Sequence, residues 1–188
     1  MPDTRFDPAS SVTFDLTRGL VHLEGAPRRL LVPADALLAL TAAAGAGATA
    51  AFGRSLGAAM GRRAAGRLSA GGAGAASVEG VVEHLGGELA LAGLGSLGLE
   101  RWGQAAVLVI DGSPLGADGD ALMEGVLAGA VEAAAGRAVQ VACIGRDGAR
   151  ARFFLGSAAG VQKVRAWLAD GVAWGEALVR LHAGRGGA

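Results

Sequence analysis

The segment from Ala138 to Ser157, AVQVACIGRDGARARFFLGS, constrains the fold more than any other part of this sequence. Two runs rich in β-branched and aromatic residues flank the turn-forming residues Arg146–Asp147–Gly148, and this arrangement predicts a β-hairpin. Successive side chains of a strand point to opposite faces of a sheet, so Phe153 and Phe154 must point apart. We therefore expect an antiparallel sheet in which only one of these two phenylalanines faces the packed helices.

The N-terminal part of the chain is expected to begin with strands. Ser11 to Leu16 alternates in the manner of a strand, and the apolar residues after it continue an extended or hairpin segment around Gly25–Arg29. Pro33 stops this segment because it cannot extend a strand ladder. Asp35 is a suitable N-cap for the helix that we expect to follow.

The stretch Asp35–Leu68 has a helical composition but contains many glycines. Each interior glycine destabilises a helix by about 0.5–1 kcal/mol relative to alanine, so we expect two helices that are broken near Gly45–Gly47. In the second helix Gly53, Gly57 and Gly61 recur every four residues and line one side. Small residues at this spacing let another backbone approach closely. They predict a helix–helix contact, within the chain or across a dimer.

The rest of the chain supplies the remaining elements of the predicted fold. They are a connector at Ser69–Ala76, a helix capped by Ser77, strands at Leu97–Arg101 and Ala105–Ile110, a helix at Ala121–Ala135 capped by Asp120, and a helical region at Val161–Leu181. The order is therefore strands, helices, hairpin, helix, hairpin, helix. This order predicts an α+β fold with helices packed on an antiparallel sheet.

Length and charge restrict the classes of protein to consider. With 188 residues, the chain is expected to form one domain over residues 11–182, with flexible tails at 1–10 and 183–188. Its 17 basic residues balance 17 acidic residues, so we expect no basic face for nucleic acid. We expect no transmembrane segment and no signal peptide, because no apolar run has the required length. The single cysteine argues for no disulfide, and a cytoplasmic bacterial protein is the expectation.

Several short segments between about Val12 and Phe154 form a pattern through their order and spacing. They are Gly19–Arg29, Leu30–Pro33, Gly53–Gly57, Gly93–Gly95, the strand Val107–Ile110, the helix with Gly125 and Gly129, Cys143 and Phe153. Their order and spacing resemble the 4-vinyl reductase domain family. Related folds occur in the TRAPP vesicle-tethering subunits and in the sensor domains of bacterial phenol-responsive activators. The resemblance implies the same α+β fold for this chain.

The resemblance also bears on metal binding in the last hairpin. Family members commonly have a cysteine there, a second cysteine eight positions later and a phenylalanine two positions beyond. Cys143 and Phe153 match the first and last of these, but Ala151 stands at the second, and Gln140 replaces a glutamate that zinc-binding relatives use. One thiolate cannot supply the four ligands that structural zinc needs, so we expect no metal and no cofactor.

Relatives in this family are expected to hold apolar ligands between the sheet and the helices, in pockets lined by aromatic and aliphatic side chains. The candidate lining residues here are Phe52, Trp102, Cys143, Phe153, Phe154 and Trp167. Each aromatic taken singly is also explained by ordinary packing. Cys143 is explained by burial as an inert thiol.

Three functions are compatible with these features. The leading hypothesis is a non-enzymatic sensor or regulatory module that holds a small apolar molecule, lipid or acyl chain, acts as a homodimer and passes its output to a partner protein. The second is an assembly or tethering subunit whose pocket is filled by its own side chains and whose glycine-lined helix serves protein contacts. The third assigns an accessory role in reducing a tetrapyrrole vinyl group. It ranks last because we find no hydride-carrier motif.

Overall fold

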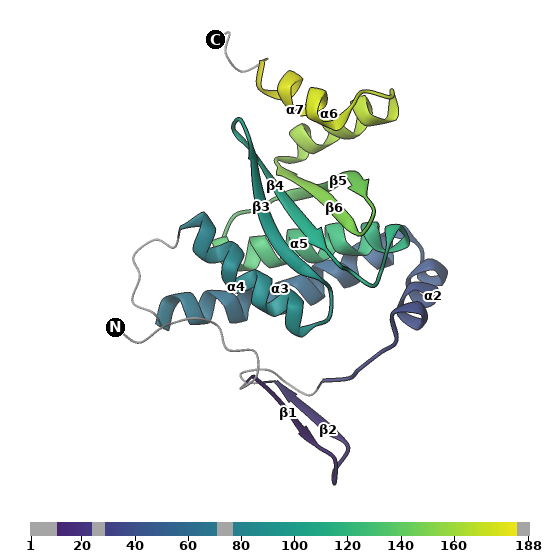
Figure 1. Cartoon of the computed structure of the whole chain (residues 1–188), viewed down its shortest axis with the longest axis vertical. Helices are drawn as coiled ribbons and strands as arrows, with labels where there is room; N and C mark the ends of the chain where they lie inside the picture. The colour runs from purple at the N-terminus through teal and green to yellow at the C-terminus, as the bar shows by residue number, and fades with distance from the viewer. Residues whose placement is uncertain (1–10, 24–28, 71–76, 184–188) are drawn as a thin grey trace.

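A four-stranded antiparallel sheet with helices packed against it forms the centre of the computed structural model (Figure 1). The structure describes residues 11–23, 29–70 and 77–183. In chain order the elements are β1 (Val12–Asp15), β2 (Leu20–Leu23), α2 (Ala34–Ala44), α3 (Ala46–Ala70), α4 (Val78–Leu91), β3 (Ser96–Trp102), β4 (Ala105–Asp111), the 3₁₀ turn η1 (Ala117–Gly119), α5 (Asp120–Ala135), β5 (Gln140–Asp147), β6 (Arg150–Gly156), α6 (Ala158–Ala169) and α7 (Trp174–Ala183). This arrangement confirms the expected α+β class.

The predicted hairpin forms one half of the sheet, whose strand order is β3-β4-β6-β5. Asp147 pairs with Arg150, so the turn consists of Gly148 and Ala149 and lies slightly later than expected. Gly148 adopts a positive φ of 56°, a conformation that glycine takes without steric cost. Arg146 and Asp147 therefore remain in β5, and the two residues that follow them form the turn.

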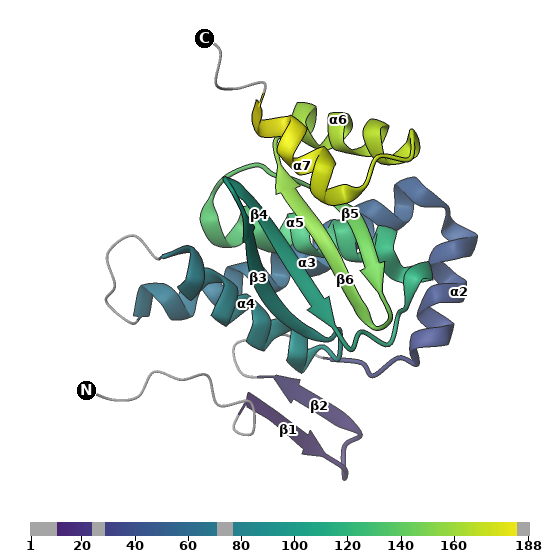
Figure 2. The same ribbon diagram turned by 45° about the horizontal axis from the view of Figure 1, so that its top comes forward.

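Helices cover both faces of this sheet, which corrects the expectation that only one phenylalanine faces helices. Phe153 packs in a buried cluster with residues of α3, α4 and α5. Phe154, on the opposite face, packs in a second cluster with α6 and α7. Figure 2 shows α6 and α7 gathered at one end of their face, whereas α3 and α5 extend along the other. The alternating side chains of β4 and β6 thus contribute to two apolar layers.

Helices α3 and α5 pack backbone against backbone. Gly53, Gly57 and Gly61 of α3 face α5 of the same chain, and a Cβ atom built on Gly57 would lie 1.9 Å from the carbonyl oxygen of Val126. In return, a Cβ built on Gly129 of α5 would lie 2.2 Å from a carbonyl oxygen of α3. Glycine is required at these positions because any other side chain would displace the backbone. Helix α5 fills this face of α3, which leaves no room on it for a second copy of the chain.

A buried carboxylate joins α3 to α4. The side chain of Glu88 on α4 is 0% exposed, and its two oxygens accept hydrogen bonds from Arg67, at 2.5 Å, and from Arg63. A buried carboxylate requires such partners, because isolated charges are strongly disfavoured away from water. This ion cluster fixes the position of α4 at one end of the helical layer.

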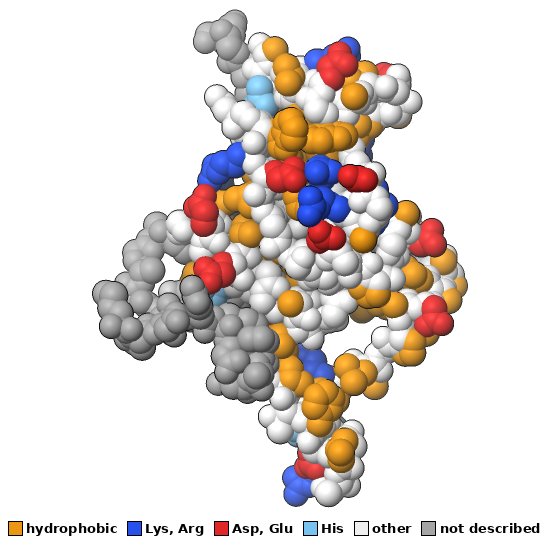
Figure 3. Space-filling view, in the orientation of Figure 1, with side chains coloured by type: hydrophobic (Ala, Val, Ile, Leu, Met, Phe, Trp, Pro, Cys, Tyr) orange, Lys and Arg blue, Asp and Glu red, His pale blue; other side chains and the backbone are white. Residues whose placement is uncertain are grey.

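The first two strands form a separate two-stranded sheet beside the rest of the molecule. Its turn lies between Asp15 and Leu20, where the carboxylate of Asp15 accepts hydrogen bonds from the backbone N–H groups of Thr17 and Arg18. Of the hairpin segment expected around Gly25–Arg29, residues 24–28 lie outside the described residues, but Arg29 forms an isolated antiparallel bridge with Val21. Figure 3 shows apolar side chains exposed on this hairpin and on the chain that follows it. They are Phe14, Leu16, Leu30, Leu31 and Val32.

The helix breaks and caps agree only in part with those predicted from the sequence. The break between α2 and α3 falls at Gly45, with a φ of 82°, and the hydroxyl of Ser77 accepts the N–H of Gly80, so both predictions are confirmed. Asp35 is not an N-cap, because α2 begins one residue earlier after Pro33. Asp120 is not a cap either, because Gly119 holds that position and the Asp120 side chain turns toward β5.

Two element boundaries also differ from the prediction. Helix α3 continues through Ser69 to Ala70, so the connector is shorter than expected, and residues 71–76 lie outside the described residues. The C-terminal helical region is two helices, because Gly171 adopts a φ of 81° and reverses the chain between α6 and α7. Within the described ranges, no helix is long and apolar enough to span a bilayer.

Candidate functional site

An apolar cavity of about 210 Å³ lies between the sheet and helices α4 and α5. Its lining residues are Val78, Val81, Val82, Leu85, Leu99, Ala106, Leu108, Val131, Ala135, Arg137, Val139 and Leu155. All of them except Arg137 are apolar, so the cavity favours compact apolar molecules over polar ones. This is the place in the fold where sequence reasoning expected a ligand pocket.

The walls follow from the local sequence patterns of α4 and β4. Val78, Val81, Val82 and Leu85 are spaced as one apolar stripe of a helix and face the sheet. On β4, Ala106 and Leu108 point to the same face because side chains alternate along a strand. Alanine at position 106 leaves space that a larger residue would fill.

The cavity reaches from solvent to the core. Leu85 and Leu108 at its inner end are 1% and 2% exposed. Val78, the first residue of α4, is 52% exposed, and Ala135 and Arg137 are also exposed. A ligand could therefore enter at this edge and bury its apolar part against the inner residues.

Cys143 belongs to β5 and contacts α5, and it does not line this cavity. Its thiol donates a hydrogen bond to Asp120 at 3.4 Å, and its backbone N–H donates to Glu124 at 2.7 Å. Burial, together with the negative charge of Asp120, raises the pKa of the Cys143 thiol to about 12. Asp120 also pairs with Arg146. The thiol is therefore protonated at neutral pH and is a weak nucleophile.

The positions related to the family's metal site serve other contacts. Ala151 is 2% exposed and packs in the core, and the side-chain oxygen of Gln140 accepts a hydrogen bond from Arg54 at 2.9 Å. Within residues 11–23, 29–70 and 77–183, no three His, Cys, Asp or Glu side chains converge on a possible metal position. The neighbours of Cys143 in the hairpin thus provide no second sulfur ligand.

Two tryptophans join α7 to the edge of the sheet. Trp102 and Trp174 meet edge to face with ring centroids 4.6 Å apart, and the Arg152 guanidinium lies 5.4 Å from the Trp174 centroid. The Trp102 indole N–H donates to Glu100 and, together with Arg152, holds the pKa of that carboxyl below its ordinary value. Figure 3 shows acidic and basic side chains side by side on this part of the sheet. We interpret the cluster as a packing contact.

A second hollow, of about 400 Å³, lies between α6, α7 and the ends of β4 and β6. Phe154 and Trp167 contribute apolar walls, whereas Lys163 and Arg180 bring charge. Because charged and apolar groups share its lining, it is less suited than the first cavity to an apolar ligand.

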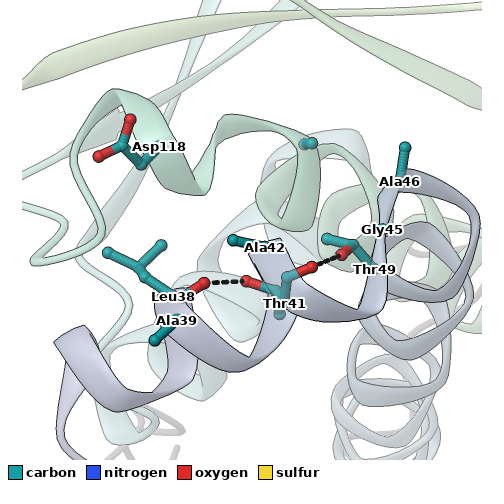
Figure 4. A pocket seen from close by; sticks show the side chains of 9 residues that line it. Leu38, Ala39, Thr41, Ala42, Gly45, Ala46, Thr49 and Asp118 are labelled. Atoms are coloured by element: carbon teal, nitrogen blue, oxygen red, sulfur yellow. Dashed lines mark hydrogen bonds between the residues drawn. The ribbon is translucent and has the colours of Figure 1, made fainter.

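A third hollow, of about 500 Å³, lies between α2 and the start of α5 (Figure 4). The hydroxyl of Thr49 donates to the carbonyl of Thr41 at 2.9 Å, and that of Thr41 donates to the carbonyl of Leu38 at 3.0 Å. Asp118 faces Leu38 across the hollow, and most other lining residues are alanine or glycine. These small side chains offer a ligand little apolar contact.

The structure does not bring the six predicted pocket residues together. Phe153 and Cys143 belong to one apolar layer, and Phe154 and Trp167 belong to the other. Phe52 and Trp102 are 46% and 44% exposed. The lining of the α4–α5 cavity is aliphatic apart from Arg137, and none of these residues is among the six predicted. The apolar stripe of α4 and the run AAVLVI of β4 were the signals that could have identified it.

Comparison with known proteins supports the fold. No protein-family model and no curated protein sequence matches the chain. The fold is similar to the crystal structure of the phenol-responsive sensory domain of the transcription activator PoxR with phenol. The match has a TM-score of 0.61 and 19% sequence identity, and it covers 96% of this chain and 96% of that chain. The chain therefore has a phenol-sensor-like fold.

Proposed function

We propose that this chain is a non-enzymatic sensory module that binds a compact apolar molecule in the cavity between α4, α5 and the sheet. The observation that carries the proposal is the composition of that cavity, whose lining is aliphatic apart from Arg137. Its volume of about 210 Å³ suits a single ring, since an apolar cavity of about 150 Å³ is enough to hold benzene.

The structural neighbour supports the same function. It is a phenol-responsive sensory domain in complex with phenol, and its fold extends over nearly all of this chain. We extend from that likeness the proposals that the chain is a member of the 4-vinyl reductase domain family, that residues 11–182 form one cytoplasmic domain and that its output passes to a partner protein. The apolar side chains exposed on the first hairpin support a homodimer, because a two-stranded sheet is marginally stable alone.

The alternative of an assembly subunit with a self-filled pocket has less support. Side chains from α4, α5 and three strands surround the cavity but leave about 210 Å³ between them. An assembly role would also require the exposed hairpin residues to contact another protein, which the sensor hypothesis requires as well. Ligand binding therefore distinguishes the two hypotheses, because only the sensor hypothesis requires it.

Thermal unfolding with single-ring phenols tests the proposal. Burying a six-carbon ring contributes about 0.8 kcal/mol per carbon before the entropic cost of binding, so we expect a Kd of about 1 mM. A ligand at about 5 mM should then stabilise the chain by about 1 kcal/mol and raise the Tm by about 2–4 °C. Native mass spectrometry of freshly purified protein would detect a co-purifying natural ligand.

Two variants, each with an alanine replaced by leucine, locate the binding site. Ala106→Leu places a larger side chain in the cavity and should abolish the Tm shift. Ala166→Leu makes the same chemical change on the exposed face of α6 and should preserve it. Equal shifts in both variants would assign binding to another site. Absence of any shift in the unmodified chain across apolar ligands, with a clean apoprotein mass, would contradict the sensor function.

A further inference from the structure

Arg137 lies at the mouth of the apolar cavity. It follows α5 directly, after Gly136 has ended the helix in a left-handed conformation, and it precedes β5. Among the lining residues it is the one with a charged or hydrogen-bonding side chain. Arg137 and Val78 both line the cavity and both are exposed, so the guanidinium lies at the side from which a ligand would enter.

The guanidinium of Arg137 has no carboxylate partner among the described residues. Most other arginines have one: Arg101 pairs with Glu79 near the start of α4, and Arg54 pairs with Glu132 on α5. Arg62 also lacks a partner among the described residues, but it is exposed on α3 and does not line the cavity. Arg137 thus combines a position at the cavity with a positive charge that no carboxylate within residues 11–23, 29–70 and 77–183 neutralises.

We propose that the ligand is a compact apolar molecule that carries one acidic group, and that Arg137 binds this group at the cavity mouth. This inference rests on the proposed ligand-binding function and specifies its ligand class. The ring or chain lies against the aliphatic walls while the carboxylate or other acidic group stays near solvent. A planar guanidinium can donate two parallel hydrogen bonds to a carboxylate.

The alternative role for Arg137 is to stabilise the C-terminus of α5. A positive charge just beyond the last turn of α5 interacts favourably with the negative end of the helix dipole. This role predicts a loss of stability on substitution without any effect on ligand preference.

Binding of benzoate and of benzyl alcohol separates these roles, because the two probes have similar apolar rings and differ in charge. Isothermal titration should show that the unmodified chain prefers benzoate by about fivefold to tenfold, as expected for a partly exposed ion pair. Arg137→Gln should remove this preference and leave benzyl alcohol binding within about twofold. Arg62→Gln, the matched control, should behave as the unmodified chain. The preference should also fall at high salt.

Each other result has a definite meaning. Equal affinity for both probes in the unmodified chain, or a preference that Arg137→Gln retains, would overturn the acidic-ligand inference while leaving the binding function intact. A variant that only lowers the Tm would assign Arg137 to the helix terminus and overturn the inference too. If neither probe binds and Ala106→Leu behaves as the unmodified chain with neutral phenols, the proposed function itself fails.

Discussion

Helix α5 contacts its two neighbouring helices in opposite ways. Against α3 it packs through glycines, with backbone meeting backbone and no space for an added carbon. Against α4 it presents Val131 and Ala135, and a cavity of about 210 Å³ remains. The difference shows how residue size decides the use of a helix face. Glycines spaced by four close a contact, whereas the larger residues between α5, α4 and the sheet leave a cavity.

The strongest test of this comparison adds one carbon to the closed contact. Gly57→Ala places a Cβ 1.9 Å from the Val126 carbonyl oxygen, so the helices must separate. We expect a loss of about 3 kcal/mol or more in the free energy of unfolding, measured by urea denaturation. Gly66→Ala is the control, because it lies in the same helix with nothing within 4 Å of its Cβ. That change should stabilise the chain by about 0.5–1 kcal/mol. Similar effects of both changes would refute the closed-contact interpretation.

The second test adds carbons to the open contact. Ala106→Leu directs its extra carbons into the cavity, so the free energy of unfolding should change by less than about 1 kcal/mol or increase. Urea denaturation without ligand measures this effect independently of binding. A destabilisation as large as that of Gly57→Ala would mean that the space beside Ala106 is already closed in solution.

The smallest expected effect concerns the side of α5 that faces β5, where Asp120 accepts a hydrogen bond from the Cys143 thiol. Because the folded pKa is raised from 9.0 to about 12, this thiol should react with a disulfide reagent at pH 8 much more slowly in the native chain than in urea. The linked stabilisation is fully present below pH 9 and is lost as the pH rises toward about 12. Fast native labelling at pH 8 would show that the hairpin opens or that the thiol is ionised.

The sequence predicted the features that depend on local geometry. Gly45 and Gly148 mark a helix break and a hairpin turn because glycine adopts positive φ angles without strain. Ser77 is a recognisable cap because its hydroxyl bonds a backbone N–H three residues later. The alternation of Phe153 and Phe154 was also correct, since it follows from strand geometry alone.

Features that depend on distant residues could not be predicted. Coverage of the second sheet face depends on Gly171, which turns α7 back over Phe154. Burial of Glu88 depends on Arg63 and Arg67, which approach only after α3 and α4 have packed together. Arg137 was missed because a single arginine after a helix forms no pattern, and the cavity beside it is made by four separate parts of the chain.

The glycine contact between α3 and α5 also bears on how this chain can evolve. Every single-base change in a glycine codon that substitutes another amino acid introduces a Cβ atom. At Gly53, Gly57, Gly61, Gly125 and Gly129 that atom would lie within 3 Å of the backbone of the facing helix. A single-base change that replaces any of these five glycines therefore disrupts the helix contact. By contrast, the aliphatic residues around the cavity can exchange among valine, leucine and isoleucine. The lining of the cavity can thus diversify along a lineage while the paired helices beside it stay fixed.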